Sequence, residues 1–178
     1  MTPRTVAALF AGAGAGLAAC DLLHVRGGVL RHRAGGPFGQ AWWVAPMFGT
    51  AGVAIVTAAR PFARATPVPS AGRIARLAAP FAIAYAATAL LANDHPRPLA
   101  AALWSTGVAR TPRRDLAFTL LLAAAGPAVE YAIASRGHFA YARPAHQVVP
   151  WLSGLYVHGA PMALAVSSRT SDSGAARR

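Results

Sequence analysis

The sequence is poor in acidic residues and in the residues that make covalent cross-links. Only five of the 178 residues are Asp or Glu, all seventeen basic residues are arginine, and the one cysteine is Cys20. A single cysteine excludes a disulfide within the chain, and no Cys-x-x-Cys or paired Cys/His spacing predicts a zinc site. With 12% charged and 55% hydrophobic residues, the chain has too little polar surface for an ordinary soluble domain.

Hydrophobic runs of membrane-spanning length predict the fold class. About 20 apolar residues cross the roughly 30 Å of a bilayer's hydrocarbon core, and the loops between such runs here are rich in Arg, Pro and Gly. We therefore predict an all-α polytopic membrane protein, a six-transmembrane-helix bundle over residues 1–166, followed by a disordered cytoplasmic tail over residues 167–178. The six predicted spans are Thr5–Val25, Gln40–Ala59, Ile74–Ala92, the shorter Leu99–Ala109, Leu116–Ala134 and Val148–Val166.

The distribution of arginine predicts the orientation of the bundle. A formal charge of +12 would suggest a nucleic-acid partner for a soluble chain, but these arginines fall in short clusters between apolar runs, where positive charge sets topology. With six crossings, eleven arginines lie on the side of the two termini and six on the opposite side. We therefore expect a protein integral to the inner cell membrane, with both termini cytoplasmic and no nucleic-acid partner.

The first predicted span permits two interpretations. Gly12 and Gly16 lie one helical turn apart among alanines, a spacing that favours close approach of another helix. Cys20 follows Leu-Ala-Ala, which is also typical of a lipoprotein cleavage site. The apolar run continues past Cys20, so the spacing favours a membrane span.

The string AWWVAPMFGT, residues 41–50, opens the second predicted span. Tryptophan is favoured at the membrane interface, which suits Trp42 and Trp43. Pro46 falls in the first turns, where a missing N–H matters least, and Gly49 allows another helix to approach. We expect these four residues to be architectural.

Buried polar and bulky residues indicate where a ligand would bind. Prolines inside predicted spans bend their helices, and alanine-rich faces leave volume between them. Glu130 lies within the fifth span, where a carboxylate costs several kcal/mol unless it is neutral or paired. We expect it to face the bundle and to meet His158, Trp151, Asp21 or a lipid hydroxyl. The predicted lipid-binding residues are Glu130, Tyr85, Phe118, Tyr131, Trp151, Tyr156 and His158.

A second interpretation rests on histidines and aspartates near the outer ends of the spans. Such a set could bind a metal and support a membrane-embedded, metal-dependent enzyme. No HxxxH or HExxH motif occurs, so we expect no bound metal and no catalytic residue. A transporter would show internal repeats, and none is evident. The residues of this set are Asp21, His24, His32, Asp94, His95, His138 and His146.

Three stretches resemble one family of membrane proteins. AWWVAPMFGTAGVAIV resembles the second-helix signature of the Insig family, the insulin-induced-gene proteins. LAAALWSTG, followed by an arginine-rich turn at 110–114, resembles the family's fourth helix and its next loop. Tyr141-Ala-Arg143, ahead of Pro150–Gly154, resembles the entry to its last helix. The absence of lysine is typical of a GC-rich bacterial genome, so the chain resembles a bacterial homologue.

This resemblance implies a non-enzymatic lipid sensor that holds an amphiphilic lipid, a diacylglycerol or a sterol-like molecule, in an intramembrane cavity without another cofactor. Eukaryotic Insig proteins bind hydroxylated sterols and retain Scap and HMG-CoA reductase in the endoplasmic reticulum. A membrane-protein partner or a second copy of the chain is implied as well. The family's loop between helices 4 and 5 carries an aspartate ahead of its arginines, whereas Asp115 follows them here. The lipid-holding bundle is therefore better supported than partner binding through that loop.

Overall fold

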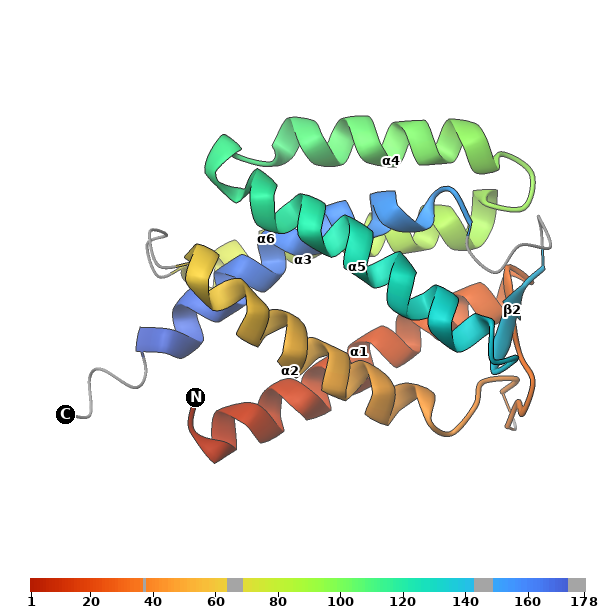
Figure 1. Cartoon of the computed structure of the whole chain (residues 1–178), viewed down its shortest axis with the longest axis horizontal. Coiled ribbons are helices and arrows are strands. Elements are labelled where there is room, and N and C mark those ends of the chain that lie inside the picture. Colours follow the sequence, from red (N-terminus) through yellow and green to blue (C-terminus); the bar gives the residue numbers. More distant parts are fainter. Residues whose placement is uncertain (37, 64–68, 143–148, 173–178) are drawn as a thin grey trace.

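A computed structural model describes residues 1–36, 38–63, 69–142 and 149–172. Six α-helices run back and forth in the described part of the chain, with the start of α1 and the end of α6 on the same side (Figure 1). The prediction of an all-α, six-helix bundle is confirmed. The helices are α1 (Pro3–Arg26), α2 (Val44–Ala63), α3 (Ala71–Leu91), α4 (Pro96–Arg110), α5 (Leu116–Ala134), which a short 3-10 turn η1 (Arg113–Asp115) precedes, and α6 (Leu152–Asp172).

Local chemistry sets several helix ends. The hydroxyl oxygen of Thr2 accepts a hydrogen bond from the backbone N–H of Thr5 at 3.2 Å, and the Ser70 hydroxyl accepts one from Arg73 at 3.2 Å. These are N-caps of α1 and α3, which satisfy otherwise unpaired amides. The second helix begins at Val44 rather than at Gln40, because a turn precedes it. Pro46 lies in its first turn, where proline is tolerated.

The surface of the bundle is apolar along the helices. α1, α3 and the segment Arg113–Ala134 are each long and apolar enough to cross a membrane. Large exposed hydrophobic side chains cover these helices and the end of α4, as suits contact with lipid tails rather than water. The chain is therefore an integral membrane protein. The exposed residues are Val6, Phe10, Leu23, Ile83, Leu90, Leu91, Val108, Leu120, Leu121, Val129 and Tyr131.

α6 is the central helix, since it packs against α2, α3, α4 and α5. Its polar residues Ser153, His158 and Ser168 therefore meet protein rather than lipid. The predicted disordered tail begins too early, because α6 continues past Val166 to Asp172. Ser168 is buried, and its hydroxyl donates to the backbone carbonyl of Ala63 at 3.4 Å. Residues 173–178 lie outside the described part of the chain.

Glycine allows α1 and α2 to approach closely. A Cβ atom placed at Gly49 would lie 2.8 Å from the ring of Phe10, and one at Gly14 would lie 2.8 Å from the carbonyl oxygen of Ala45. Gly12 and Gly16 have no such neighbour within 4 Å. The prediction that these two glycines form a helix contact is wrong, because α1 is rotated so that Gly14 faces α2.

Two loops predicted as irregular pair in a small sheet at the end opposite the termini. Strand β1 (Leu30–His32) runs antiparallel to β2 (Phe139–Tyr141), with Leu30 opposite Tyr141. The N–H of Arg33 donates to His138 at 3.0 Å and that of Ala142 donates to Val29 at 2.9 Å. We call residues 29–33 and 138–142 the cap. The bundle end beneath it is the cap end, and the opposite end is the terminal end.

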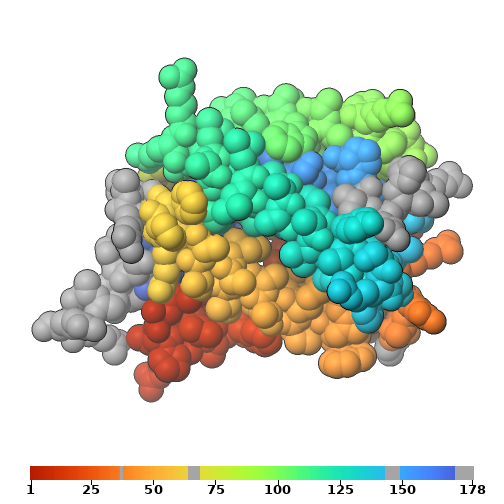
Figure 2. Space-filling model, in the orientation of Figure 1, coloured from red at the N-terminus to blue at the C-terminus, as the bar shows by residue number. Residues whose placement is uncertain are grey.

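The described part of the interior has three apolar clusters, the smallest of which joins Ala18, Ala41 and Val44. The cap-end cluster includes Tyr85, Tyr141, Trp151 and Leu152. The terminal-end cluster is built from Ala59, Ala63, Phe118, Leu122, Ala160, Ala163 and Leu164. In the space-filling view, a hollow separates α2 from α5 on the face turned to the viewer (Figure 2).

Candidate functional site

The Glu130 carboxylate is held by two tyrosines at the cap end. The hydroxyl of Tyr141, on β2, donates to Oε2 at 2.5 Å, and that of Tyr156, on α6, donates to Oε1 at 2.8 Å. Gly126 makes the second contact possible: it lies one turn before Glu130 on α5, and a Cβ there would be 2.4 Å from the Tyr156 ring. The predicted partners of Glu130 were wrong, apart from a lipid hydroxyl, which the structure does not test.

Tyr141 is buried within the cap-end cluster, outside the membrane-spanning helices. Burial, together with the neighbouring Glu130 carboxylate and its hydrogen bond, raises the pKa of this phenol well above its usual value. The phenol is therefore protonated at neutral pH and acts as a donor. Among the described residues no cationic side chain pairs with Glu130, and its hydrogen bonds come from the two tyrosine hydroxyls.

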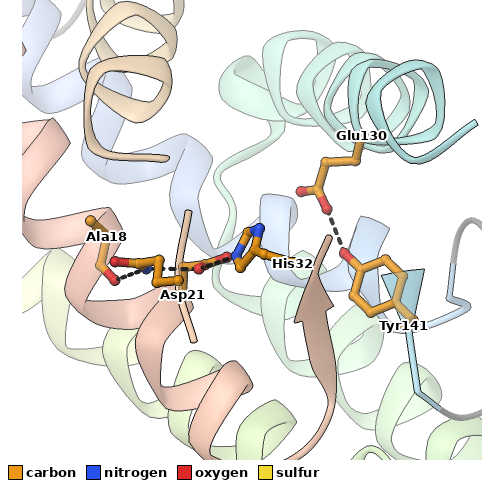
Figure 3. A network of polar contacts seen from close by, with 6 residues as sticks. Ala18, Asp21, His32, Glu130 and Tyr141 are labelled. Atoms are coloured by element: carbon orange, nitrogen blue, oxygen red, sulfur yellow. Dashed lines mark hydrogen bonds and ion pairs between the residues drawn. The ribbon is translucent and has the colours of Figure 1, made fainter. Parts of the chain in front are cut away.

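Asp21 forms a second buried network, between α1 and the cap. Its Oδ2 atom accepts from His32 Nε2 at 2.9 Å and from Gln40 Nε2 at 2.7 Å. The Gln40 amide also donates to the carbonyl of Ala18 at 2.8 Å. Figure 3 shows this network and the Glu130–Tyr141 contact in one view, with both strand side chains directed into the bundle. The cap is thus tied to two helices, α1 and α5.

An aromatic wall connects these two networks. The His24 ring stacks on Tyr85 at a centroid distance of 4.9 Å, and Trp151 lies 5.4 Å from His24 and 5.6 Å from Tyr141. His24 Nε2 is 2.7 Å from the hydroxyl of Thr88, which donates to the backbone carbonyl of Tyr85. Because Thr88 uses its proton in that bond, His24 donates to Thr88.

Two donors in this wall have no hydrogen-bond partner among the described residues. Tyr85 is 7% exposed, and no hydrogen bond in the described part of the chain uses its hydroxyl. The Trp151 indole nitrogen is fully buried and equally unpaired. Buried polar groups are nearly always hydrogen-bonded, so unpaired donors inside a membrane bundle point to a missing acceptor.

The structure brings together four of the seven predicted lipid-binding residues: Glu130, Tyr85, Trp151 and Tyr156. The other three lie elsewhere. Phe118 is in the terminal-end cluster, with its ring 5.4 Å from that of Phe62. Tyr131 is 52% exposed on the outside of α5. His158 faces α4, where its Nε2 is 3.1 Å from the carbonyl of Leu103.

Sequence reasoning missed the residues that the loops supply. Tyr141 entered only through a family resemblance, and its role as a donor to Glu130 was not foreseen. The alternation in Phe-Ala-Tyr, buried-exposed-buried in the structure, was the available signal. His32 and Gln40 were not linked to Asp21, because their loop has no periodic pattern that fixes which side chains turn inward.

The outer-end histidines and aspartates do not gather into one site. Among the described residues, no three His, Cys, Asp or Glu side chains are placed to hold one metal ion. Asp21 contacts His32 rather than His24, which turns to α3. Asp94, His95 and His138 are exposed, and His146 lies outside the described residues.

Fold and site together define an integral membrane bundle with a polar, aromatic interior at one end. The chain has the fold of a mycobacterial Insig homologue, MvINS from Mycobacterium vanbaalenii, whose crystal structure aligns with a TM-score of 0.80 over 95% of this chain and 94% of that chain, at 22% identity. A crystal structure of a cross-linked trimer of an MvINS variant aligns with a TM-score of 0.77 over 97% of this chain and 96% of that one, at 20% identity. The predicted resemblance is therefore confirmed at the level of the fold. No family model and no curated protein matches the sequence.

Proposed function

We propose that this chain is a non-enzymatic membrane protein that senses lipids by holding one amphiphilic lipid, a diacylglycerol or a sterol-like molecule, with its polar end at the cap end of the bundle. The observation that carries the proposal is the Trp151 indole N–H, a fully buried donor that has no hydrogen-bond partner among the described residues. An ester or hydroxyl oxygen of a lipid would satisfy it.

Glu130 supports the same location. Its two tyrosines use two acceptor positions, and a carboxylate offers about four, so room for a lipid hydroxyl remains. Glu130 and Tyr156 are only partly buried, although their contacts join α5, α6 and the cap. Protein atoms therefore do not fill all the space beside them. In a low dielectric each additional hydrogen bond to this carboxylate counts for more than it would in water.

The fold supports the proposal at a coarser level. A mycobacterial Insig homologue has this architecture. Prolines lie inside α3, α5 and α6, where each removes a backbone hydrogen bond and favours a bend that leaves space between helices. Self-association belongs to the proposal too, because the second crystal structure is described as a trimer. A membrane-protein partner remains the other form of association that the family implies.

Native mass spectrometry of detergent-extracted protein tests the proposal. We expect one neutral lipid per chain in the wild type, nearly normal occupancy in Glu130→Gln, and loss or replacement of the lipid in Glu130→Leu and Tyr85→Phe. Tyr131→Phe is the matched control, because that exposed tyrosine lies next to Glu130 on α5.

Two results would count against the proposal. Equal lipid occupancy in wild type, Glu130→Leu and Tyr85→Phe would show that these side chains do not bind the polar end of the lipid. Absence of lipid from every sample would show that the bundle does not hold one. The same spectra give the oligomeric mass. Elemental analysis for zinc and iron decides the alternative, since a stoichiometric metal would favour the enzyme that the histidines suggested.

A further inference from the structure

We propose that the cap is a gate over the interior site, that Tyr141 is its latch, and that a lipid hydroxyl which reaches Glu130 releases it. The inference rests on the proposed function for the identity of the ligand. The evidence for the latch is independent of it, and comes from how the cap is attached to the bundle.

The cap cannot hold itself closed. Its two strands pair over three residues each, and an isolated two-stranded ribbon is at best marginally stable in water. Its position therefore depends on the side chains that it directs inward. Leu30 and Phe139 supply apolar contacts in the cap-end cluster, whereas His32 and Tyr141 supply polar ones.

Each polar contact ends on a carboxylate, and the two carboxylates lie on different helices. His32 reaches Asp21 on α1, and Tyr141 reaches Glu130 on α5. Figure 3 shows these contacts on opposite sides of the same region of the bundle. The two-stranded ribbon therefore lies across the cap end of the bundle and is hydrogen-bonded to a helix on each side.

The His32–Asp21 and Tyr141–Glu130 contacts differ in how easily a ligand hydroxyl could displace the cap residue. At α1, Gln40 donates to the same Asp21 oxygen as His32 and also to the Ala18 carbonyl, so the loop is held at several points. At α5, the latch is a single phenol. If that phenol leaves, Tyr156 still donates to Oε1, and a lipid hydroxyl can replace Tyr141 at Oε2. Glu130 then exchanges one donor for another, which costs it little. We therefore place the hinge at α1 and the opening edge at β2.

Hydrogen exchange of the cap amides tests the latch. Tyr141→Phe keeps the ring that packs on Trp151 and removes only the hydroxyl. A hydrogen bond to a charged group is worth enough that we expect about tenfold faster exchange in peptides covering residues 29–33 and 138–142. Tyr131→Phe, on α5 but exposed, should exchange as the wild type does.

Added 1,2-dioctanoylglycerol tests the gate. We expect it to speed cap exchange in the wild type to about the level of Tyr141→Phe, and to have no further effect in that variant. Cap exchange in Tyr141→Phe that equals the wild type would overturn the latch. Unchanged wild-type exchange, with the lipid seen bound by native mass spectrometry, would overturn the gate.

Failure of the proposed function has a different signature. Dioctanoylglycerol that binds neither protein in the mass spectra would refute the lipid site, while the exchange rates of the variant alone still decide whether Tyr141 holds the cap. If Tyr141→Phe does not fold, Glu130→Gln provides the same comparison, because an NH2 group, which cannot accept a tyrosine proton, replaces one of the two carboxylate oxygens. Faster exchange confined to the cap supports the latch, and wild-type exchange contradicts it.

Discussion

At the cap end, the buried side chains of Asp21 and His24 and the partly buried side chain of Glu130 are each hydrogen-bonded to a residue from another helix or strand. At the terminal end, α2, α5 and α6 meet through alanines, leucines and Phe118 in an apolar cluster. The buried acid of that end, Asp115, has the Arg114 guanidinium 3.7 Å away. The helices are therefore joined by hydrogen bonds at the cap end and mainly by apolar packing at the terminal end.

The difference assigns roles to the two ends. Polar groups inside a membrane protein are costly and usually functional. At the cap end they hydrogen-bond to residues of other helices or strands, whereas the buried hydroxyls of Thr111 and Thr119 at the terminal end donate to a backbone carbonyl one turn earlier in the chain. Close apolar packing has few alternative arrangements, which suits a fixed base. We infer that the terminal end sets the geometry of the bundle and that the cap end changes when a ligand binds.

The largest expected effect concerns which compartment each end faces, because it is all or none. The arginine count predicts that the terminal end is cytoplasmic. A reporter active only in the cytoplasm should give signal when fused after Arg178, and none when inserted at Gly36, in the exposed loop of the cap end. Signal from the insertion at Gly36, with none from the fusion after Arg178, would show that the cap end rather than the terminal end faces the cytoplasm.

A smaller effect is expected at the contact between α1 and α2, which runs through both ends. Gly49→Leu would place side-chain atoms where the backbone of Phe10 lies, 2.8 Å from a Cβ at this position. We expect a loss of about 3 kcal/mol, the upper range for overpacking, measured as a lower melting temperature in detergent. Gly12→Leu is the matched control, since no such neighbour lies within 4 Å. Equal melting temperatures for the two variants would show that α1 and α2 do not approach at Gly49.

The smallest effects separate the two kinds of contact directly. Asp21→Ala leaves the donors of His32 and Gln40 without their acceptor, and we expect it to cost about 2 kcal/mol and to speed hydrogen exchange in the cap. Phe118→Leu, in the apolar cluster, should cost about 1 kcal/mol and leave cap exchange and lipid occupancy unchanged. A Phe118→Leu protein with altered lipid occupancy would show that the two ends do not act separately.

Several features of the protein were determined by the sequence alone. Apolar runs of the right length, broken by arginine, proline and glycine, placed six helices, because only helices of that length satisfy their backbone hydrogen bonds in lipid. The position of Glu130 on α5 was equally clear, since a carboxylate within an apolar run must find a donor. Tyr85, Trp151 and Tyr156 were named from their bulk or predicted depth and lie in the same cluster as Tyr141, whereas Phe118 and Tyr131, named from their bulk, lie elsewhere.

Tertiary structure decided the remainder. Gly14 faces α2 while Gly12 and Gly16 do not, because the rotation of a helix about its axis depends on how the neighbouring surfaces fit. His158 turns to α4 for the same reason. Tyr141 donates to Glu130 only because two strands of three residues pair across the bundle end. An alternation of only three residues, as in Phe-Ala-Tyr, is too short to predict a strand, and the pairing depends on the helices that bring the two loops together.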